Sequence, residues 1–319
     1  RRVVAGNAAA GPGSRQRPFT IVAEFDGTAP ADVRAAAKNL IISALEESGV
    51  IAALPDDQVR LGLTLAGKPE TTRVDVTTAR ELAVRGAVRT VLTGTIDRVG
   101  QTYHVAVRAL DADSNVVVRA RSEIARGDDD LIPTLDRVVR ALRANLGERR
   151  AAIAPNRSLE EALTPSFAAY QRYLRARALV VRGGDNVGAV AVYKEALALD
   201  PEFAEAWRAL SAAYSNLGFQ DSGVSALNKA LARPDRLTGY QRLISESYLA
   251  GYRGDDSTAL ALAEQARRLY GGPPLSVAIR LSRLGHLREE VALYEEWERS
   301  APYGLRPIDV SNLAASLLA

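Results

Sequence analysis

The residue types that support catalysis or metal binding are scarce in this chain. Its 319 residues include no cysteine and only two histidines, His104 and His286. Neither histidine has a second one at helical or hairpin spacing, so a zinc site or a histidine pair for acid–base work has no basis here. We expect His104 to lie on a solvent-facing strand position and His286 to lie in a turn after Gly285. The sequence therefore predicts no catalytic residue, no cofactor and no metal site.

One acidic segment has the spacing of a calcium-binding loop but departs from it at two positions. Asp111, Asp113 and Asn115 match the first ligands of such a loop. The sixth position is Val116, where glycine is needed for the sharp turn, and the twelfth is Ser122 instead of glutamate. Phosphate-binding, dinucleotide-binding and nucleophile-elbow motifs are also missing from the sequence. The acidic segment is therefore predicted to be a turn between two strands.

Composition limits the class of partner. The chain has 41 Lys and Arg against 38 Asp and Glu, a net charge of +3, and the two signs are interleaved along the sequence. This pattern lacks the basic stripe of a nucleic-acid-binding surface. No run approaches the roughly 18 apolar residues of a membrane-spanning helix, so we expect any membrane attachment to come from upstream of Arg1 or from a partner. With 47% hydrophobic residues the chain is predicted to fold into two domains with packed cores.

The C-terminal half has a repeat with a period close to 34 residues. Glycines recur at intervals of 34, 36 and 31 residues, each after a helix-length segment: Gly184, Gly218, Gly254 and Gly285. Glycine suits the left-handed backbone that reverses the chain after a helix. This period is typical of stacked two-helix units.

Small residues support the same arrangement. They recur seven residues apart, which puts each pair on one helix face where a neighbouring helix can approach closely: Ala189, Ala196, Gly223, Ala230, Ala259 and Ala266. The segment Ala204–Gly218, with Trp207 and Tyr214 at packing positions, resembles the tetratricopeptide repeat (TPR) pattern. Glu290 and Trp297 fall at the small positions of the last unit, as a terminal repeat allows. The resemblance implies a curved helical array that binds protein partners.

The N-terminal half is predicted to be a mixed α and β domain. Its expected strands are 19–25, 50–54, 90–98, 102–110 and 116–123, and its expected helices are 31–48, 55–65, 77–85 and 131–146. The last three strands are joined by turns and should form an antiparallel meander. The fold class is therefore an α+β domain of about five strands followed by an all-α TPR-like array.

This order of elements, with the meander sequence 91–111 at its centre, resembles the TolB amino-terminal-like domain. The resemblance covers residues 18–150. It implies an extracytoplasmic placement, because this domain often precedes TPR repeats in the extracytoplasmic regions of bacterial serine/threonine kinases and adenylate cyclases. No kinase motif occurs in the sequence, so any kinase activity would lie outside this chain.

Five segments follow from these patterns. They are an extended arm (1–17), the TolB-like domain (18–150), a linker with a short capped helix (151–165), about four TPR-like helix pairs (166–302) and a C-terminal capping helix (303–319). The arm is rich in Gly, Ala and Pro, and we expect a partner subunit to hold it in place. Hydrogen exchange of the isolated protein would show instead whether the arm folds back on its own domain.

The first helix of each unit in a TPR array lines the concave face. Extending the register puts a set of arginine, tyrosine and amide side chains on this face: Gln171, Leu174, Arg182, Arg208, Asn216, Gln241, Tyr248, Tyr252 and Arg283. Such a surface suits acidic or carboxylate-bearing segments of a protein, unless these side chains are merely solvated or covered by the neighbouring domain. Arg1 and Arg2 of the arm complete the predicted partner-binding residues.

Two functions from different classes remain open at this point. The first is a non-catalytic interaction or scaffold protein, an accessory subunit docking on a membrane-associated complex. The alternative is the extracytoplasmic sensory region of a bacterial serine/threonine kinase or cyclase, which would bind a ligand. The family resemblance places either one in the periplasm, attached to the membrane through a partner or a missing N-terminal segment, while the residues themselves leave the cytoplasmic face open.

Overall fold

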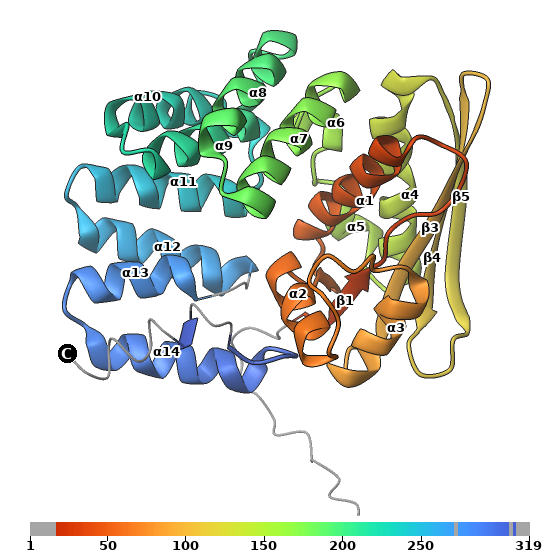
Figure 1. Cartoon of the computed structure of the whole chain (residues 1–319), viewed down its shortest axis with the longest axis horizontal. Helices are drawn as coiled ribbons and strands as arrows, with labels where there is room; N and C mark the ends of the chain where they lie inside the picture. The colour runs from red at the N-terminus through yellow and green to blue at the C-terminus, as the bar shows by residue number, and fades with distance from the viewer. Residues whose placement is uncertain (1–16, 271–273, 306–308, 311–319) are drawn as a thin grey trace, which may run out of the picture.

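The chain folds into a head built on a mixed β-sheet and a curved array of paired helices beside it (Figure 1). The computed structural model describes residues 17–270, 274–305, 309 and 310. The α+β domain followed by a helical array that the sequence predicts is confirmed. Arg1, Arg2 and nearly all of the predicted arm lie outside the described residues.

The head contains a five-stranded sheet with the strand order β2-β1-β3-β4-β5. Its strands are β1 (Phe19–Val22), β2 (Ala52–Ala53), β3 (Thr90–Val99), β4 (Thr102–Asp111) and β5 (Val117–Arg126). β1 runs parallel to β2 and β3, whereas β3, β4 and β5 form the predicted antiparallel meander. The first strand ends at Val22, earlier than expected, and the amide of Glu24 donates to the carbonyl of Val74 (2.7 Å), which is not in a strand. The segment still follows β3, because the amides of Ala23 and Asp26 donate to carbonyl oxygens of that strand.

Helices cover both faces of this sheet. α1 (Ala31–Glu46) and α4 (Leu131–Asn145) lie on one face, and α2 (Asp56–Leu65) and α3 (Val76–Arg85) lie on the other. Successive side chains of a strand point to opposite faces. Accordingly, Leu92 of β3 packs in the core with α1 and α4, whereas Val91 packs with Leu82 of α3.

Four consecutive helix pairs form the array between residues 167 and 300. They are α7 (Phe167–Gly183) with α8 (Asn186–Leu199), α9 (Ala204–Asn216) with α10 (Gln220–Leu231), α11 (Gly239–Tyr252) with α12 (Asp256–Tyr270), and α13 (Leu275–Arg283) with α14 (Leu287–Ser300). The repeat glycines all have φ between 64° and 81°, the left-handed backbone that favours glycine.

The small residues let the helices approach closely, as predicted. All six are buried, and a Cβ on Gly223 would lie 2.8 Å from Oγ of Ser215 on the neighbouring helix. In the last pair, Glu290 and Trp297 take these positions and are also buried. A larger side chain at residue 223 would push α9 and α10 apart.

The segment between head and array is packed into the structure. It contains α5 (Arg150–Ile153) and α6 (Leu159–Ala162). The capping box predicted around Ser158 forms, because the Ser158 hydroxyl accepts from the amide of Glu161 and the Glu161 carboxylate accepts from the amide of Ser158. Leu159 and Leu163 are part of the main core. This segment therefore fixes the head relative to the array.

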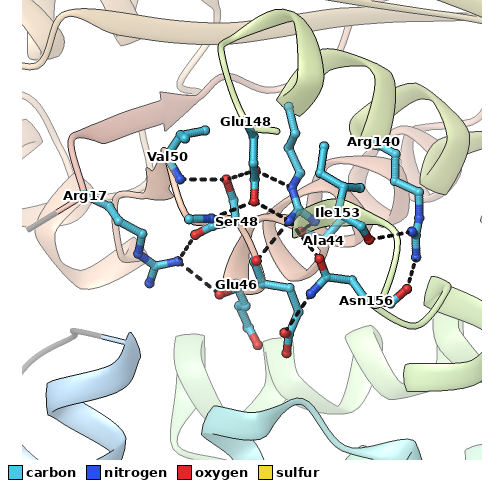
Figure 2. Close-up of polar contacts among 12 residues, drawn as sticks. Arg17, Ala44, Glu46, Ser48, Val50, Arg140, Glu148, Ile153 and Asn156 are labelled. Carbon is cyan, nitrogen blue, oxygen red and sulfur yellow. Dashed lines mark hydrogen bonds and ion pairs between the residues drawn. The ribbon is translucent and has the colours of Figure 1, made fainter. Parts of the chain in front are cut away.

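A buried ion pair holds the end of α1 at this junction (Figure 2). Arg143 of α4 donates two hydrogen bonds of 2.8 Å to Glu148, and the two side chains are 3% and 5% exposed. The same carboxylate accepts from the hydroxyl of Ser48 (2.8 Å) and the amide of Gly49 (2.9 Å). Burial by itself would raise the pKa of Glu148, but these donors outweigh it and lower the pKa to about 2.

The two carboxylates at the end of α1 meet the start of α11. Thr238, the N-cap of α11, donates from its hydroxyl to Glu46 (3.2 Å), and the amide of Gly239 donates to Glu47 (3.3 Å). A helix N-terminus favours negative charge, so these contacts dock the third helix pair on the head. Arg17 adds a bridge by donating to the carbonyl oxygens of Glu46 (3.1 Å) and Tyr270.

The far end of the array also touches the head. The Tyr303 hydroxyl donates to the carbonyl of Leu82 in α3 (2.5 Å). The ring of Tyr303 sits on Gly62 and Gly86, where a Cβ would lie 2.8 Å from it. Residues 303–305 are not helical, residues 309 and 310 are, and the rest of the predicted capping helix lies outside the described residues. The array is thus fastened to the head at both ends.

Candidate binding site

A cavity of about 300 Å³ lies between the inner face of the array and α1. Side chains from α1, α7, α9, α11 and α13 and one residue after α6 line it: Ser43, Glu46, Leu163, Tyr170, Tyr173, Arg177, Glu205, Arg208, Tyr240, Gln241, Ile244, Tyr248 and Ser276. The first helix of every pair and one helix of the head therefore contribute to its lining. Four tyrosines, two arginines and two glutamates give it a polar lining.

One arginine of the cavity is fully engaged by its neighbour. Arg208 donates two hydrogen bonds of 2.6 Å to the Glu205 carboxylate, which is 3% exposed. Tyr173 donates a third hydrogen bond of 2.8 Å to the same carboxylate. Although burial acts to lower the pKa of Arg208, the Glu205 carboxylate holds it above its ordinary value. This arrangement is a structural pair, since removing either partner would leave a buried charge alone.

The second arginine of the cavity, Arg177, has no carboxylate partner among the described residues. Arg177 makes no ion pair or hydrogen bond with any described residue, and its only close partner is the ring of Tyr173, whose centroid lies 5.9 Å from the guanidinium carbon. Tyr173 and the nearby Tyr170 and Glu205 raise the pKa of Arg177 above its ordinary value, so the side chain is cationic at all relevant pH values. Its five N–H donors are available to a bound group.

A carboxyl group with a shifted pKa faces these arginines. Burial raises the pKa of Glu46 to about 7, and the nearby Glu205 carboxylate adds to the shift. The hydrogen bond from Thr238 and the charges of Arg208 and Arg177 act in the opposite direction without cancelling it. Glu46 therefore changes its charge near neutral pH.

The predicted partner-binding residues divide into two groups in the structure. Four face the head: Gln171 donates to Asp32 of α1 (2.7 Å), Arg208 pairs with Glu205, Gln241 completes the cap of α11, and Tyr248 lines the cavity beneath Arg280. Arg208, Gln241 and Tyr248 belong to the cavity itself. The concave face is thus partly covered by the head, which the sequence left open as an alternative.

Three others lie at the turns within the helix pairs. Asn216 donates to Asn186 (3.1 Å), and the hydroxyls of Tyr252 and Ser215 are 2.6 Å apart. Arg283 pairs with Asp256 at 3.3 Å. Leu174 packs against the main core. The side chain of Arg182, and both arginines of the arm, lie outside the described part of the chain.

Arg177 and Glu46 of the cavity are not among the residues predicted from the sequence. Arg177 lies four residues after Tyr173 and seven after Tyr170, so helical spacing alone places these three side chains on one face of α7. The helical spacing was therefore enough to predict that these three side chains lie together. No local pattern could have shown that Ser43 and Glu46 of the head face them, because these contacts bridge more than 100 residues.

Comparison with family models finds a match at residues 181–218, to the TPR repeat. No curated protein sequence matches the chain. Across the described residues no helix is long and apolar enough to cross a membrane, and no group of acidic, histidine or cysteine side chains could hold a metal ion.

Similar solved structures cover a minority of the chain. The C-terminal domain of LpoB from Salmonella enterica is 10% identical with a TM-score of 0.30, covering 34% of this chain and 82% of that one. The same domain from Escherichia coli is 12% identical with a TM-score of 0.31, covering 36% and 87%. The PelC dodecamer from Paraburkholderia phytofirmans is 15% identical with a TM-score of 0.30, covering 44% and 95%. At these values the similarities carry no functional argument.

Proposed function

We propose that this protein is a non-catalytic interaction protein that docks on a subunit of a membrane-associated complex. The observation that supports it most is the array of four stacked helix pairs that contains the TPR repeat at residues 181–218. A repeat of this kind supports a protein-interaction role, because stacked units present an extended surface. Its partners are proteins.

The turns within the helix pairs are the best place for a partner to dock. The inner face is partly covered by α1, whereas the turns project away from the head (Figure 1). The Asn216–Asn186 and Tyr252–Ser215 contacts join successive turns into one edge. Phe219 at this edge is 58% exposed. Exposed aromatic side chains are enriched where proteins bind one another. We call this surface the turn edge.

The test uses recovery of partners from native membranes. The tagged chain is incubated with detergent-solubilised membranes of its source, and bound proteins are identified by mass spectrometry. The double variant Phe219→Ala/Tyr252→Ala should lose the specific partner, because it removes two large exposed side chains without touching a core. Val99→Ala, at the exposed tip of the β3–β4 hairpin, is the matched control and should retain it. Recovery of the wild-type chain alone and monomeric would contradict the proposal.

The proposed location is extracytoplasmic, with attachment through a partner or through a segment upstream of Arg1. It depends on the resemblance of residues 18–150 to the TolB amino-terminal-like domain, which stays a prediction from the order of elements. Protease treatment of intact and lysed spheroplasts provides the test. The protein should be degraded in intact spheroplasts, and protection there would place it in the cytoplasm.

One observation favours the alternative function, a sensory region of a membrane-bound kinase or cyclase. The cavity between head and array contains an arginine without a partner and is large enough for a small ligand. A scaffold alone needs no such space. The two functions are compatible if ligand binding controls how the array is held against the head.

A further inference from the structure

We propose that the cavity between α1 and the inner face of the array binds a small organic carboxylate, and that Arg177 is the residue that receives its carboxyl group. This inference rests on the cavity and not on the docking of a protein partner. It extends the sensory alternative by naming the chemical class of the ligand.

The choice of a carboxylate follows from the difference between the two arginines. Arg208 already has its carboxylate, since Glu205 accepts both of its hydrogen bonds at 2.6 Å. Arg177 lies one helix away on α7, lines the same cavity, and has no carboxylate. A guanidinium binds carboxylates through two parallel N–H donors, and such bonds are strongest where water is scarce. The cavity therefore contains a guanidinium group that can pair with the carboxylate of a ligand.

The rest of the lining favours a small polar molecule. The hydroxyls of Tyr240 and Tyr248 make no hydrogen bond with other described residues, and Ser43 and Ser276 add two more hydroxyls. A volume of about 300 Å³ is at the lower end of the roughly 300–1,000 Å³ of ligand pockets. An extended peptide needs an open groove, and α1 covers part of the inner face where the cavity lies. Both facts favour a ligand of amino-acid size over a protein segment.

The charges around the cavity give binding a dependence on pH. They come from Glu46 on α1, Arg177 on α7, and Glu205 with Arg208 on α9, while α11 contributes only tyrosines and uncharged residues. Arg280 of α13 lies behind the ring of Tyr248 and pairs with Asp256. The Glu205–Arg208 pair is neutral in sum. Between pH 6 and 8 the net charge therefore depends on Glu46, which repels an anion when ionised. We expect tighter binding at pH 6 than at pH 8.

Such a ligand would contact the head and the array together. Ser43 and Glu46 belong to α1, whereas Arg177, Tyr240 and Tyr248 belong to the first helices of the array. Binding would favour the arrangement in which these elements face each other. Ligand binding would therefore change the stability of the contact between the head and the array.

The experiment is calorimetric titration of the complete chain with three carboxylates and their uncharged amides. The probes are N-acetylalanine, succinate and benzoate, each beside its amide of nearly equal shape. At least one carboxylate should bind about 10 to 100 times more tightly than its amide, which corresponds to the ~1.5–3 kcal/mol of a hydrogen bond to a charged group. Binding should weaken at pH 8, and Glu46→Gln should remove this pH effect.

Arg177→Gln should abolish the preference for the carboxylate over its amide. Arg175→Gln is the matched control, because Arg175 lies on the same helix but is exposed. Equal loss in both variants, or a preference that survives Arg177→Gln, would overturn the assignment. If Arg177→Gln does not fold, hydrogen exchange of the wild-type chain decides instead. The carboxylate, and not the amide, should then protect α1 and α11.

Two further outcomes count against the proposal. Failure of all three carboxylates to bind more tightly than their amides at millimolar concentration would reject it. The peptide N-acetyl-tetraalanine is tested with a free and with an amidated C-terminus. Binding of the free peptide without binding of any small carboxylate would assign the cavity to a protein C-terminus. Neither outcome bears on the turn edge, so the fate of the docking proposal is measured separately.

Discussion

Arginine and glutamate meet in two places along α1, with opposite results. At the junction with α4, Arg143 and Glu148 form a buried pair whose carboxylate also accepts from Ser48 and Gly49, and the pKa of Glu148 falls to about 2. In the cavity, Glu46 contacts only Thr238 through its side chain, and its pKa rises to about 7. The Glu148 carboxyl group is buried, and the Glu46 carboxyl group is partly buried. Hydrogen-bond donors decide which of them keeps its charge.

This difference separates a structural cluster from a binding site. A buried carboxylate with a full set of donors is stable where it is and has nothing left to offer a ligand. An arginine without a carboxylate, close to a glutamate that is half protonated at neutral pH, is incomplete. The junction therefore holds the fold together, and the cavity has capacity for another molecule. The predictions below test this division in order of expected effect.

Loss of the junction pair should have the largest effect. Arg143→Ala would leave the Glu148 carboxylate buried without its cation and remove a donor to the carbonyl oxygens of Ala44 and Glu47. Breaking a buried pair in this way costs about 3–5 kcal/mol. Urea unfolding should show a free energy of unfolding lower by this amount, with Arg175→Ala as an exposed control near zero. A loss below 1 kcal/mol would mean that the Arg143–Glu148 pair stabilises the fold no more than an exposed side chain does.

The pH dependence of stability should have opposite signs at the two carboxyl groups. The pKa of Glu46 is raised in the folded state, so its ionisation opposes folding and stability is lost as pH rises from about 4.5 to 7. The pKa of Glu148 is lowered, so its contribution is present above about 4.5 and is lost as pH falls towards 2.

The matching variant is Glu46→Gln, followed by urea unfolding from pH 4.5 to 7.5. The shift corresponds to about 2 kcal/mol after allowance for partial exposure of the side chain. The variant should therefore gain about this much stability relative to wild type across that range. A constant difference between the two proteins would show that Glu46 titrates normally.

Tyr303→Ala should affect α2 and α3 more than the junction. The ring lies on Gly62 and Gly86 and its hydroxyl bonds to Leu82, so its removal releases the end of the array from α2 and α3. For a half-buried aromatic contact we expect a loss of about 1–2 kcal/mol. Hydrogen exchange should increase in α2 and α3 but stay unchanged at Ser48 and Gly49. Faster exchange at the junction as well would mean that the two regions are not independent.

Arg177→Gln should have the smallest effect on stability. Its guanidinium has no carboxylate partner, so without a ligand the free energy of unfolding should change by less than about 1 kcal/mol. The direct comparison is with Arg143→Ala under the same conditions. If both variants lose the same stability, Arg177 has a structural role and the contrast between the two regions fails.

Local patterns predicted the repeat and most elements because they depend on spacing along the chain. Gly184 and Gly218 fix the turns of their helix pairs, and Ala189 and Ala196 fix a close contact, whatever the rest of the molecule does. The same patterns placed Arg208 and Tyr248 on the inner face. They did not show that Glu205 would form an ion pair with Arg208, although the two are three residues apart on one helix.

The sequence by itself determined a mixed head and an array of paired helices, because helix and strand periods act over a few residues. Only the tertiary structure decided what the inner face meets. Docking of α1 covers part of it and brings Glu46 within reach of residues more than 100 positions away, while Arg177 has no carboxylate partner among the described residues. Burial and charge pairing depend on neighbours in space. A local period in the sequence does not specify those neighbours.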